Sequence, residues 1–289
     1  MRVIPEADLS RLSGYGCPSR AETLAEVFSR DELIEALGRF SAQGSPVHIA
    51  GAGYNTLYGP SGVKGAVITL RGEFEEVKTE PSSIRAGAGA SLGKILRVSA
   101  RMGYSGLEFL AGIPGTAAGA LVCNSGTAEK WIGGVLREAE VLREGRFLRI
   151  AAGDIPFSYR SSGFYPGDII TEAVFETVSG DPETVSRRIS RLAEEKRKKH
   201  PAGGNCGCVF RNPENGKVSA GMLIRRSGLA GVSSGGARVS EKHCNFIVCR
   251  PGTPASDVWN LIKKIRVAVL ESTGVELELE LKLAGEGFD

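Results

Sequence analysis

The sequence predicts a mixed fold of helices and strands, of the α/β or α+β class. Apolar residues recur at helical spacing in several segments, and short apolar runs typical of strands lie between those segments. The chain has 289 residues, 42% hydrophobic and 24% charged, which is enough for buried cores in two domains or one large domain. The hydrophobic share excludes a disordered chain, and the 39 glycines follow no collagen-like triplet period.

Residue patterns predict four helices in chain order. Three begin with a polar side chain suited to an N-cap, followed by apolar residues at helical spacing. The fourth is recognised from its apolar stripe alone. The signals are Ser29 with Glu32, Ser91 with Gly103 as the stop, Asp181 with Pro182 for a helix over about 182–199, and the stripe from Val258 to Val269.

Strands are predicted between these helices and at the C-terminus. Short apolar runs at Val47–Ala50, Val67–Leu70 and Ile169–Phe175 are typical of strands. From Val275 to Leu283 apolar residues alternate with polar ones, which predicts a strand with one buried face. Its polar face carries Glu276, Glu278, Glu280 and Lys282.

Charge and hydropathy exclude several classes of protein. The chain has 36 Lys plus Arg and 33 Asp plus Glu, a net charge of +3. This small charge does not indicate a nucleic-acid partner. No apolar run reaches the roughly 18 residues that a membrane span needs, so we expect no membrane partner. Residues 1–10 lack the apolar core of a signal peptide, which predicts a cytoplasmic protein.

Six cysteines raise the alternatives of disulfides, a metal site or reduced thiols. The chain is long for a disulfide-stapled scaffold and shows no secretion signal. One residue separates Cys206 from Cys208 and four separate Cys244 from Cys249, a poor match to the usual paired zinc ligands, even with His243 adjacent. We therefore expect reduced thiols and no metal.

Two glycine-rich segments are candidate cofactor loops. The first, 51–56, follows a predicted strand, and such glycines let main-chain N–H groups approach a phosphate. It is not a dinucleotide fingerprint, because Thr56 stands where the last glycine belongs, and no Gly-Lys-Ser/Thr follows as in a P-loop. The second runs from Gly112 to Gly126. Tight turns are the alternative for each, but together they favour a pyrophosphate-containing cofactor.

Motifs in a fixed order resemble the UDP-N-acetylenolpyruvoylglucosamine reductase family, flavoenzymes that complete UDP-N-acetylmuramate synthesis for peptidoglycan. They span about residue 45 to the C-terminus. The motifs are Gly51-x-Gly53-x-Asn55-x-Leu57, Ala86–Gly89, Gly106–Gly115, Tyr159-Arg160-Ser161-Ser162-x-Phe164, Cys206–Pro213 with Ala220-Gly221-x-Leu223-Ile224, Gly235–Val248, and Gly274-Val275-x-Leu277-Glu278-x-Glu280.

The resemblance implies an α+β fold and an FAD- and NADPH-dependent reductase. It implies a two-subdomain FAD-binding unit of the vanillyl-alcohol oxidase type over 1–180, split near 72–76, and a C-terminal α/β substrate domain over 181–289. The length is similar to a shorter subgroup that lacks one substrate-covering insertion. The implied FAD-binding residues are Gly51, Ala52, Gly53, Tyr54, Asn55, Thr56, Leu57, Gly112, Ile113, Pro114, Gly115, Thr116, Gly119, Asn124, Ser125 and Gly126.

The resemblance also implies a catalytic set of Arg160, Cys208 and Glu280. Arg160 would stabilise the substrate carboxylate, although a surface salt bridge is the plainer interpretation of that residue. Cys208 stands where most family members have a proton-donating serine, and a thiol is intrinsically the better acid; a buried structural cysteine is the alternative. Glu280 is selected only by the family register, since a solvated acidic stripe would show the same alternation.

Substrate-binding residues implied by the family are Tyr159, Lys199, Asn212 and Ser240, for a nucleotide-sugar substrate. Residues 13–19 lack the family's usual N-terminal Thr and Gly-Gly segment, and residues 124–127 read Asn-Ser-Gly-Thr in place of Asn-Ala-Gly-Ala. Two other functions stay open: another FAD-dependent oxidoreductase of the same fold group, and a non-catalytic flavin or nucleotide-sugar binding protein.

Overall fold

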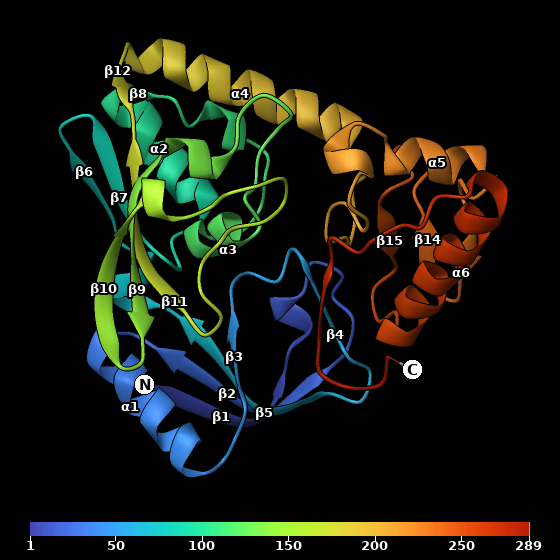
Figure 1. Ribbon diagram of the computed structural model, residues 1–289, viewed down its shortest axis with the longest axis horizontal. Helices are drawn as coiled ribbons and strands as arrows, with labels where there is room; N and C mark the ends of the chain where they lie inside the picture. The colour runs from blue at the N-terminus through green and yellow to red at the C-terminus, as the bar shows by residue number, and fades with distance from the viewer. Residues whose placement is uncertain (289) are drawn as a thin grey trace. The chain divides into compact units, whose positions relative to one another are not determined.

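The computed structural model describes residues 1–288 and divides into two compact units. Unit 1 comprises residues 1–2, 25–42 and 68–196, and unit 2 comprises residues 3–24, 43–67 and 197–289. Figure 1 traces both units along the chain. The predicted division into domains 1–180 and 181–289 is a different partition, and it stays a prediction.

Unit 1 is built on a five-stranded antiparallel sheet with the order β10-β9-β11-β7-β6. Helices α2 and α3 pack on this sheet, and α1, α4 and the short β8–β12 pair complete the unit. Leu92, Ile95, Leu121 and Phe175 are fully buried in its core. The bounds are β6 Val77–Glu80, β7 Ser83–Gly87, β8 Tyr104–Ser105, β9 Leu136–Arg143, β10 Arg146–Ala151, β11 Ile169–Glu176, β12 Val178–Ser179, α1 Arg30–Ala42, α2 Leu92–Met102, α3 Ala117–Val122 and α4 Pro182–Lys199.

Unit 2 combines small sheets with two helices. A four-stranded sheet, most of whose residues belong to unit 2, has the order β1-β2-β5-β3. Strands β13-β14-β15 form a second sheet, and β4 pairs in parallel with β16. The bounds are β1 Arg2–Asp8, β2 Arg20–Val27, β3 Val47–Ala50, β4 Thr56–Tyr58, β5 Val63–Leu70, β13 Ser233–Ser234, β14 Ala237–Val239, β15 Ile247–Cys249, β16 Lys282–Ala284, α5 Ala220–Arg226 and α6 Ala255–Thr273.

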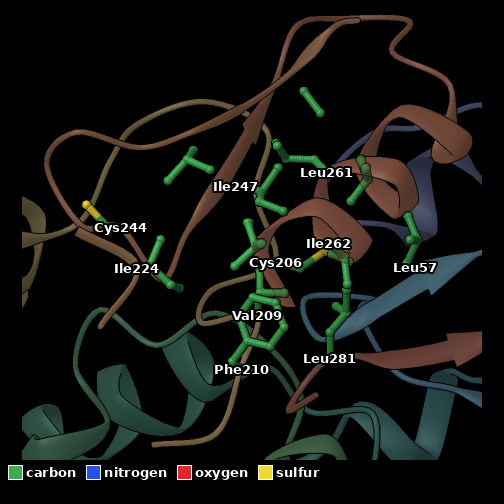
Figure 2. Close-up of a cluster of buried hydrophobic side chains, with 14 of the residues drawn as sticks. Leu57, Cys206, Val209, Phe210, Ile224, Cys244, Ile247, Leu261, Ile262 and Leu281 are labelled. Atoms are coloured by element: carbon green, nitrogen blue, oxygen red, sulfur yellow. The ribbon is translucent and has the colours of Figure 1, made fainter. Parts of the chain in front are cut away.

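The main core of unit 2 gathers side chains from distant parts of the chain. Leu57, Phe210, Leu261 and Leu281 are among its buried members, and Figure 2 shows them in one cluster. Phe210 lies two residues after the predicted donor Cys208, and Leu281 directly follows the predicted acid Glu280. The core therefore anchors the two segments that carry these residues.

The predicted helices are confirmed, together with their caps. Ser29 Oγ accepts the Glu32 N–H at 3.3 Å, and Ser91 Oγ accepts the Lys94 N–H. The Asp181 carboxylate accepts the Thr184 N–H at 2.7 Å. These bonds satisfy N–H groups that the first helical turn leaves without partners. No helix within residues 1–288 has the length and apolar character needed to cross a membrane.

The predicted C-terminal strand is wrong over most of its length. Only Lys282–Ala284 forms a strand, while residues 275–281 belong to no strand and make one isolated bridge, Phe210–Leu279. In the segment opposite it, the Val209 and Phe210 N–H groups donate to Asn245 and are therefore not available to pair with this segment. The predicted faces do hold, because Leu277 and Leu281 are buried while Glu276 and Glu278 are exposed.

Candidate active site

The first glycine loop joins β3 to β4 in unit 2. Gly53 has φ +71°, and a Cβ there would lie 1.6 Å from the Leu12 carbonyl oxygen. Its own carbonyl accepts the Gly14 N–H at 3.0 Å. Glycine at 53 is therefore required by packing against residues 12–14, whatever the loop binds.

Asn55 connects this loop to the segment that carries Glu280. Its side-chain amide donates to the Glu280 carbonyl at 3.1 Å, and its own carbonyl accepts the Lys282 N–H at 3.0 Å. The parallel β4–β16 pairing, with Thr56 opposite Lys282, continues the contact. The predicted cofactor loop and the predicted acid thus share one stretch of main-chain structure. Among the other predicted loop residues, Gly51 and Tyr54 are exposed, Ala52 is half-buried and Leu57 is fully buried.

Cys208 and Glu280 lie on two segments that main-chain hydrogen bonds join. The Val209 carbonyl accepts the N–H groups of Glu280 at 2.9 Å and Leu281 at 3.2 Å, and the Arg211 N–H donates to the Glu278 carbonyl at 2.9 Å. The structure therefore brings together two of the three predicted catalytic residues. Glu280 is half-buried, whereas Glu276 and Glu278, on the same face of the alternating pattern, are exposed.

Asn245, absent from the predicted site, fixes the segment beside Cys208. Its carboxamide accepts the Phe210 N–H at 2.9 Å and donates to the Phe210 carbonyl at 2.8 Å. Its main-chain carbonyl accepts the Val209 N–H at 2.8 Å. The side chain is 2% exposed, so these partners replace water. A lone asparagine before the apolar run Phe246–Val248 is the signal that could have identified it.

The two cysteines of the Cys206-Gly207-Cys208 segment differ in environment. Cys206 is buried, and its thiol faces the Gly53 and Thr56 carbonyls at 3.5 Å each. Burial raises the pKa of Cys206 to about 12, so it stays a neutral thiol. Cys208 is half-buried. A positive-φ glycine between the two cysteines allows their side chains to diverge.

The predicted substrate-binding residues of unit 2 lie at different depths. Asn212 Oδ1 accepts the Ala220 N–H at 3.0 Å at the start of α5. Ser240 is 8% exposed, and its hydroxyl accepts the His243 N–H in the loop that also holds Asn245. Lys199 is exposed at the end of α4. Ser240 thus belongs to the framework of the Cys208 segment.

The second glycine loop lies in unit 1 and leads into α3. Gly115 has φ +133°, and a Cβ there would meet no atom within 4 Å. Gly112 has φ +73° and is exposed beside Lys196, Ile113 is half-buried and Pro114 exposed. Thr116 caps α3, with its hydroxyl accepting the Gly119 N–H at 3.3 Å. Open space next to bare main chain at Gly115 is the feature expected where a cofactor lies against the backbone.

The end of this loop is tied to a turn that carries Arg160. Asn124 is 5% exposed, donates from its side chain to the Ser158 carbonyl at 2.8 Å and accepts the Gly133 N–H at 3.2 Å. Its side chain is therefore engaged within the protein, and its main-chain N–H donates to the Leu121 carbonyl at 3.0 Å. The Ser125 N–H bonds to the Ala120 carbonyl, and Gly126 pairs with Trp131.

Arg160 occupies the turn together with Tyr159. Its φ of +53° lies in the left-handed region, and its guanidinium carbon is 5.8 Å from the centre of the Tyr159 ring. Burial, and next the charge of Arg160, lower the pKa of Lys196 to about 8, while its ammonium group donates to the Phe109 carbonyl at 2.9 Å. Two cations thus stand near the second glycine loop. Arg160 belongs to unit 1, whereas Cys208 and Glu280 belong to unit 2.

Comparison with known proteins decides the family. Residues 21–150 match the FAD binding domain family, and residues 198–284 match the C-terminal domain of UDP-N-acetylenolpyruvoylglucosamine reductase. The chain is 37% identical to the UDP-N-acetylenolpyruvoylglucosamine reductase of Moorella thermoacetica over 290 residues, covering 100% of this chain and 95% of that protein. The chain belongs to the UDP-N-acetylenolpyruvoylglucosamine reductase family.

Other relatives agree with this assignment. The reductase of Geobacter metallireducens is 33% identical, with 98% of this chain and 94% of that protein covered. The crystal structure of the Thermus caldophilus reductase matches with a TM-score of 0.84 at 32% identity, covering 98% of each chain. The α+β fold, with an FAD-binding domain and the family's C-terminal domain, is therefore confirmed, as is the expected FAD dependence.

Proposed function

We propose that the protein uses NADPH, through FAD, to reduce UDP-N-acetylglucosamine enolpyruvate to UDP-N-acetylmuramate, a peptidoglycan precursor, in the cytoplasm. The observation that supports this most directly is the main-chain pairing of the Cys208 and Glu280 segments beside the Asn55 loop. In this proposal the pairing holds the segment of the proposed proton donor, Cys208, beside that of the proposed acid, Glu280.

FAD, when bound, supplies the hydride that adds to the vinyl CH2 of the substrate. Negative charge then develops at C2, which the substrate carboxylate shares. In this proposal Arg160 holds that carboxylate with a fixed positive charge, and Glu280 stabilises the developing charge by a hydrogen bond. Cys208 donates its proton to C2 and is reprotonated from water, so the overall reaction consumes one NADPH and one proton.

The residues proposed to bind FAD are those of the two loops, Gly51–Leu57 and Gly112–Thr116 with Gly119 and Asn124–Gly126. The open main chain at Gly115 fits such a ligand. Tyr159, Lys199, Asn212 and Ser240 are the proposed contacts for the nucleotide sugar.

Cys208 must remain protonated to act as the donor. Its place after a positive-φ glycine, on a half-buried segment, separates it from Cys206, whose thiol points at carbonyl groups of the first loop. This difference in surroundings favours a chemical role for Cys208 and a packing role for Cys206.

An anaerobic titration of the purified protein tests the function. We expect a yellow protein whose flavin absorbance is bleached by NADPH and restored by UDP-N-acetylglucosamine enolpyruvate, with UDP-N-acetylmuramate as product. Restoration by oxygen but not by the enolpyruvyl substrate would indicate an oxidase of the same fold group. A flavin that NADPH cannot bleach would indicate a binding protein.

A further inference from the structure

The residues that carry this inference lie in two loops of unit 1, residues 122–133 and 157–162. In the second loop Ser158 and Ser161 exchange main-chain hydrogen bonds at 3.0 and 3.1 Å, which closes a tight turn with Tyr159 and Arg160 at its tip. The guanidinium that the proposed function needs therefore projects from a turn of only four residues.

The backbone of this turn is strained at the functional residue. Arg160 has φ +53°, and a left-handed conformation costs a residue with a side chain roughly 1–2 kcal/mol. Strain of this kind persists only where the surrounding structure imposes it. Two hydrogen bonds across a four-residue turn are a weak constraint, so other contacts must hold it.

Asn124 supplies the principal contact. Its amide donates to the Ser158 carbonyl at 2.8 Å, so this oxygen accepts both the Asn124 side chain and the Ser161 N–H. Its carboxamide oxygen accepts the Gly133 N–H at 3.2 Å, which fixes the orientation of the amide. At 5% exposure these bonds face little competition from water.

Two neighbouring contacts reinforce the same connection. The Ser162 hydroxyl donates to the Val122 carbonyl at 3.1 Å, which joins the end of the turn to the other loop. Gly133 is pressed against the ring of Phe157, since a Cβ at 133 would lie 2.5 Å from that ring. The turn is thus attached to residues 122–133 on both sides of Arg160.

We propose that Asn124 is a positioning residue for Arg160: its carboxamide holds the turn in the left-handed conformation that sets the direction of the guanidinium. The inference rests on the proposed function, in which Arg160 binds the substrate carboxylate. Small misplacements of a catalytic group are costly, so releasing the turn slows the step that uses Arg160 on the order of tenfold or more.

Asn124→Gly is the informative variant, because Asn124 itself has φ +41° and glycine keeps that backbone while removing the carboxamide. The first measurement is hydrogen exchange of the holoenzyme, followed by mass spectrometry. We expect exchange in residues 157–162 to accelerate about tenfold or more, while peptides from β9 and β10 keep their wild-type rates. Ser162→Ala, which removes only the second attachment, should give a smaller acceleration in the same peptide. Unchanged exchange of residues 157–162 in both variants would refute the proposal.

The second measurement is a double-mutant cycle on reoxidation of the NADPH-reduced enzyme by the enolpyruvyl substrate in a single turnover. Asn124→Gly should slow this step about tenfold or more in the presence of Arg160, and less than about threefold in an Arg160→Ala background. Equal losses in both backgrounds would show that Asn124 acts through general stability and would overturn the positioning role. If the wild-type enzyme is not reoxidised by this substrate, the proposed function fails, and hydrogen exchange alone then decides whether Asn124 holds the turn.

Discussion

The proposed catalytic groups are held by different means in the two units. In unit 2, Cys208 and Glu280 lie on segments joined by main-chain hydrogen bonds through Val209 and anchored by the buried side chains of Phe210 and Leu281. In unit 1, Arg160 lies on a short strained turn that side chains of another loop hold in place. Main-chain pairing survives most substitutions, whereas a turn held by side chains depends on the identity of a few residues. We therefore expect a substitution in unit 2 to change either the reaction rate or the stability. A substitution at the turn of unit 1 should change both.

The largest effect expected is on chemistry in unit 2. Cys208→Ala should leave reduction of the flavin by NADPH nearly intact and slow reduction of the enolpyruvyl substrate about 100-fold, or about 3 kcal/mol of barrier. Cys208→Ser should retain much of the activity, because a hydroxyl can donate the same proton. Stopped-flow measurement of the two half-reactions separates these outcomes.

Cys206→Ala is the matched control for this prediction. The Cys206 thiol contacts the Gly53 and Thr56 carbonyls in the core, so its removal should lower stability and barely change the second half-reaction. If Cys208→Ala slowed both half-reactions equally, Cys208 would not be the proton donor.

The next effect is on the framework of the same segment. Asn245→Ala leaves the N–H and C=O of Phe210 buried without their side-chain partner, which should lower the free energy of unfolding by about 2 kcal/mol or more. Urea denaturation measures this loss. Asn260→Ala, at an exposed position of α6, should change stability by less than about 0.5 kcal/mol. A similar small change for Asn245→Ala would show that main-chain pairing alone holds the segment.

A smaller effect, on stability, should separate two variants at the strained turn of unit 1. Arg160→Gly and Arg160→Ala both remove the cation, and both should abolish most reduction of the enolpyruvyl substrate. Only glycine relieves the left-handed conformation, so Arg160→Gly should be more stable than Arg160→Ala by about 0.5–1 kcal/mol. Thermal unfolding compares the two variants, and equal stabilities would mean that the turn carries no strain.

A pH-dependent effect concerns the charge of Lys196 near Arg160. Burial lowers the folded-state pKa of Lys196 from 10.5 to about 8, so between these values the unfolded chain binds a proton that the folded chain does not. The contribution of Lys196 to stability is therefore least favourable below pH 8 and improves as the pH rises from about 8 to 10.5. In Lys196→Met this rise in stability with pH should be missing. Urea denaturation at pH 7, 9 and 10 measures the free energy of unfolding of both proteins. If the stabilities of the wild-type protein and of Lys196→Met changed equally with pH, the Lys196 ammonium group would be in contact with water.

Local sequence signals determined much of the fold. The capping residues Ser29, Ser91 and Asp181 satisfy helix N–H groups a few residues away, so their effect is readable along the chain. The same holds for the helix over Pro182–Lys199, which begins at the predicted proline. The motif order also identified the family, because each motif lies within a short stretch of sequence.

Only the tertiary structure decided which groups meet and how they are held. Alternation from Val275 to Leu283 indicated the buried face, but the length of the strand depended on its neighbour, whose Val209 and Phe210 N–H groups bond to Asn245 instead. No local pattern sets Glu280 apart from Glu276 and Glu278; burial and a bond from Asn55, 225 residues away, do so. The side-chain hydrogen bonds of Asn124 and Asn245 likewise join residues that are 34 and 35 positions apart in the sequence. Hydrogen bonds between distant segments leave no periodicity in the sequence, since their partners become neighbours only when the chain has folded.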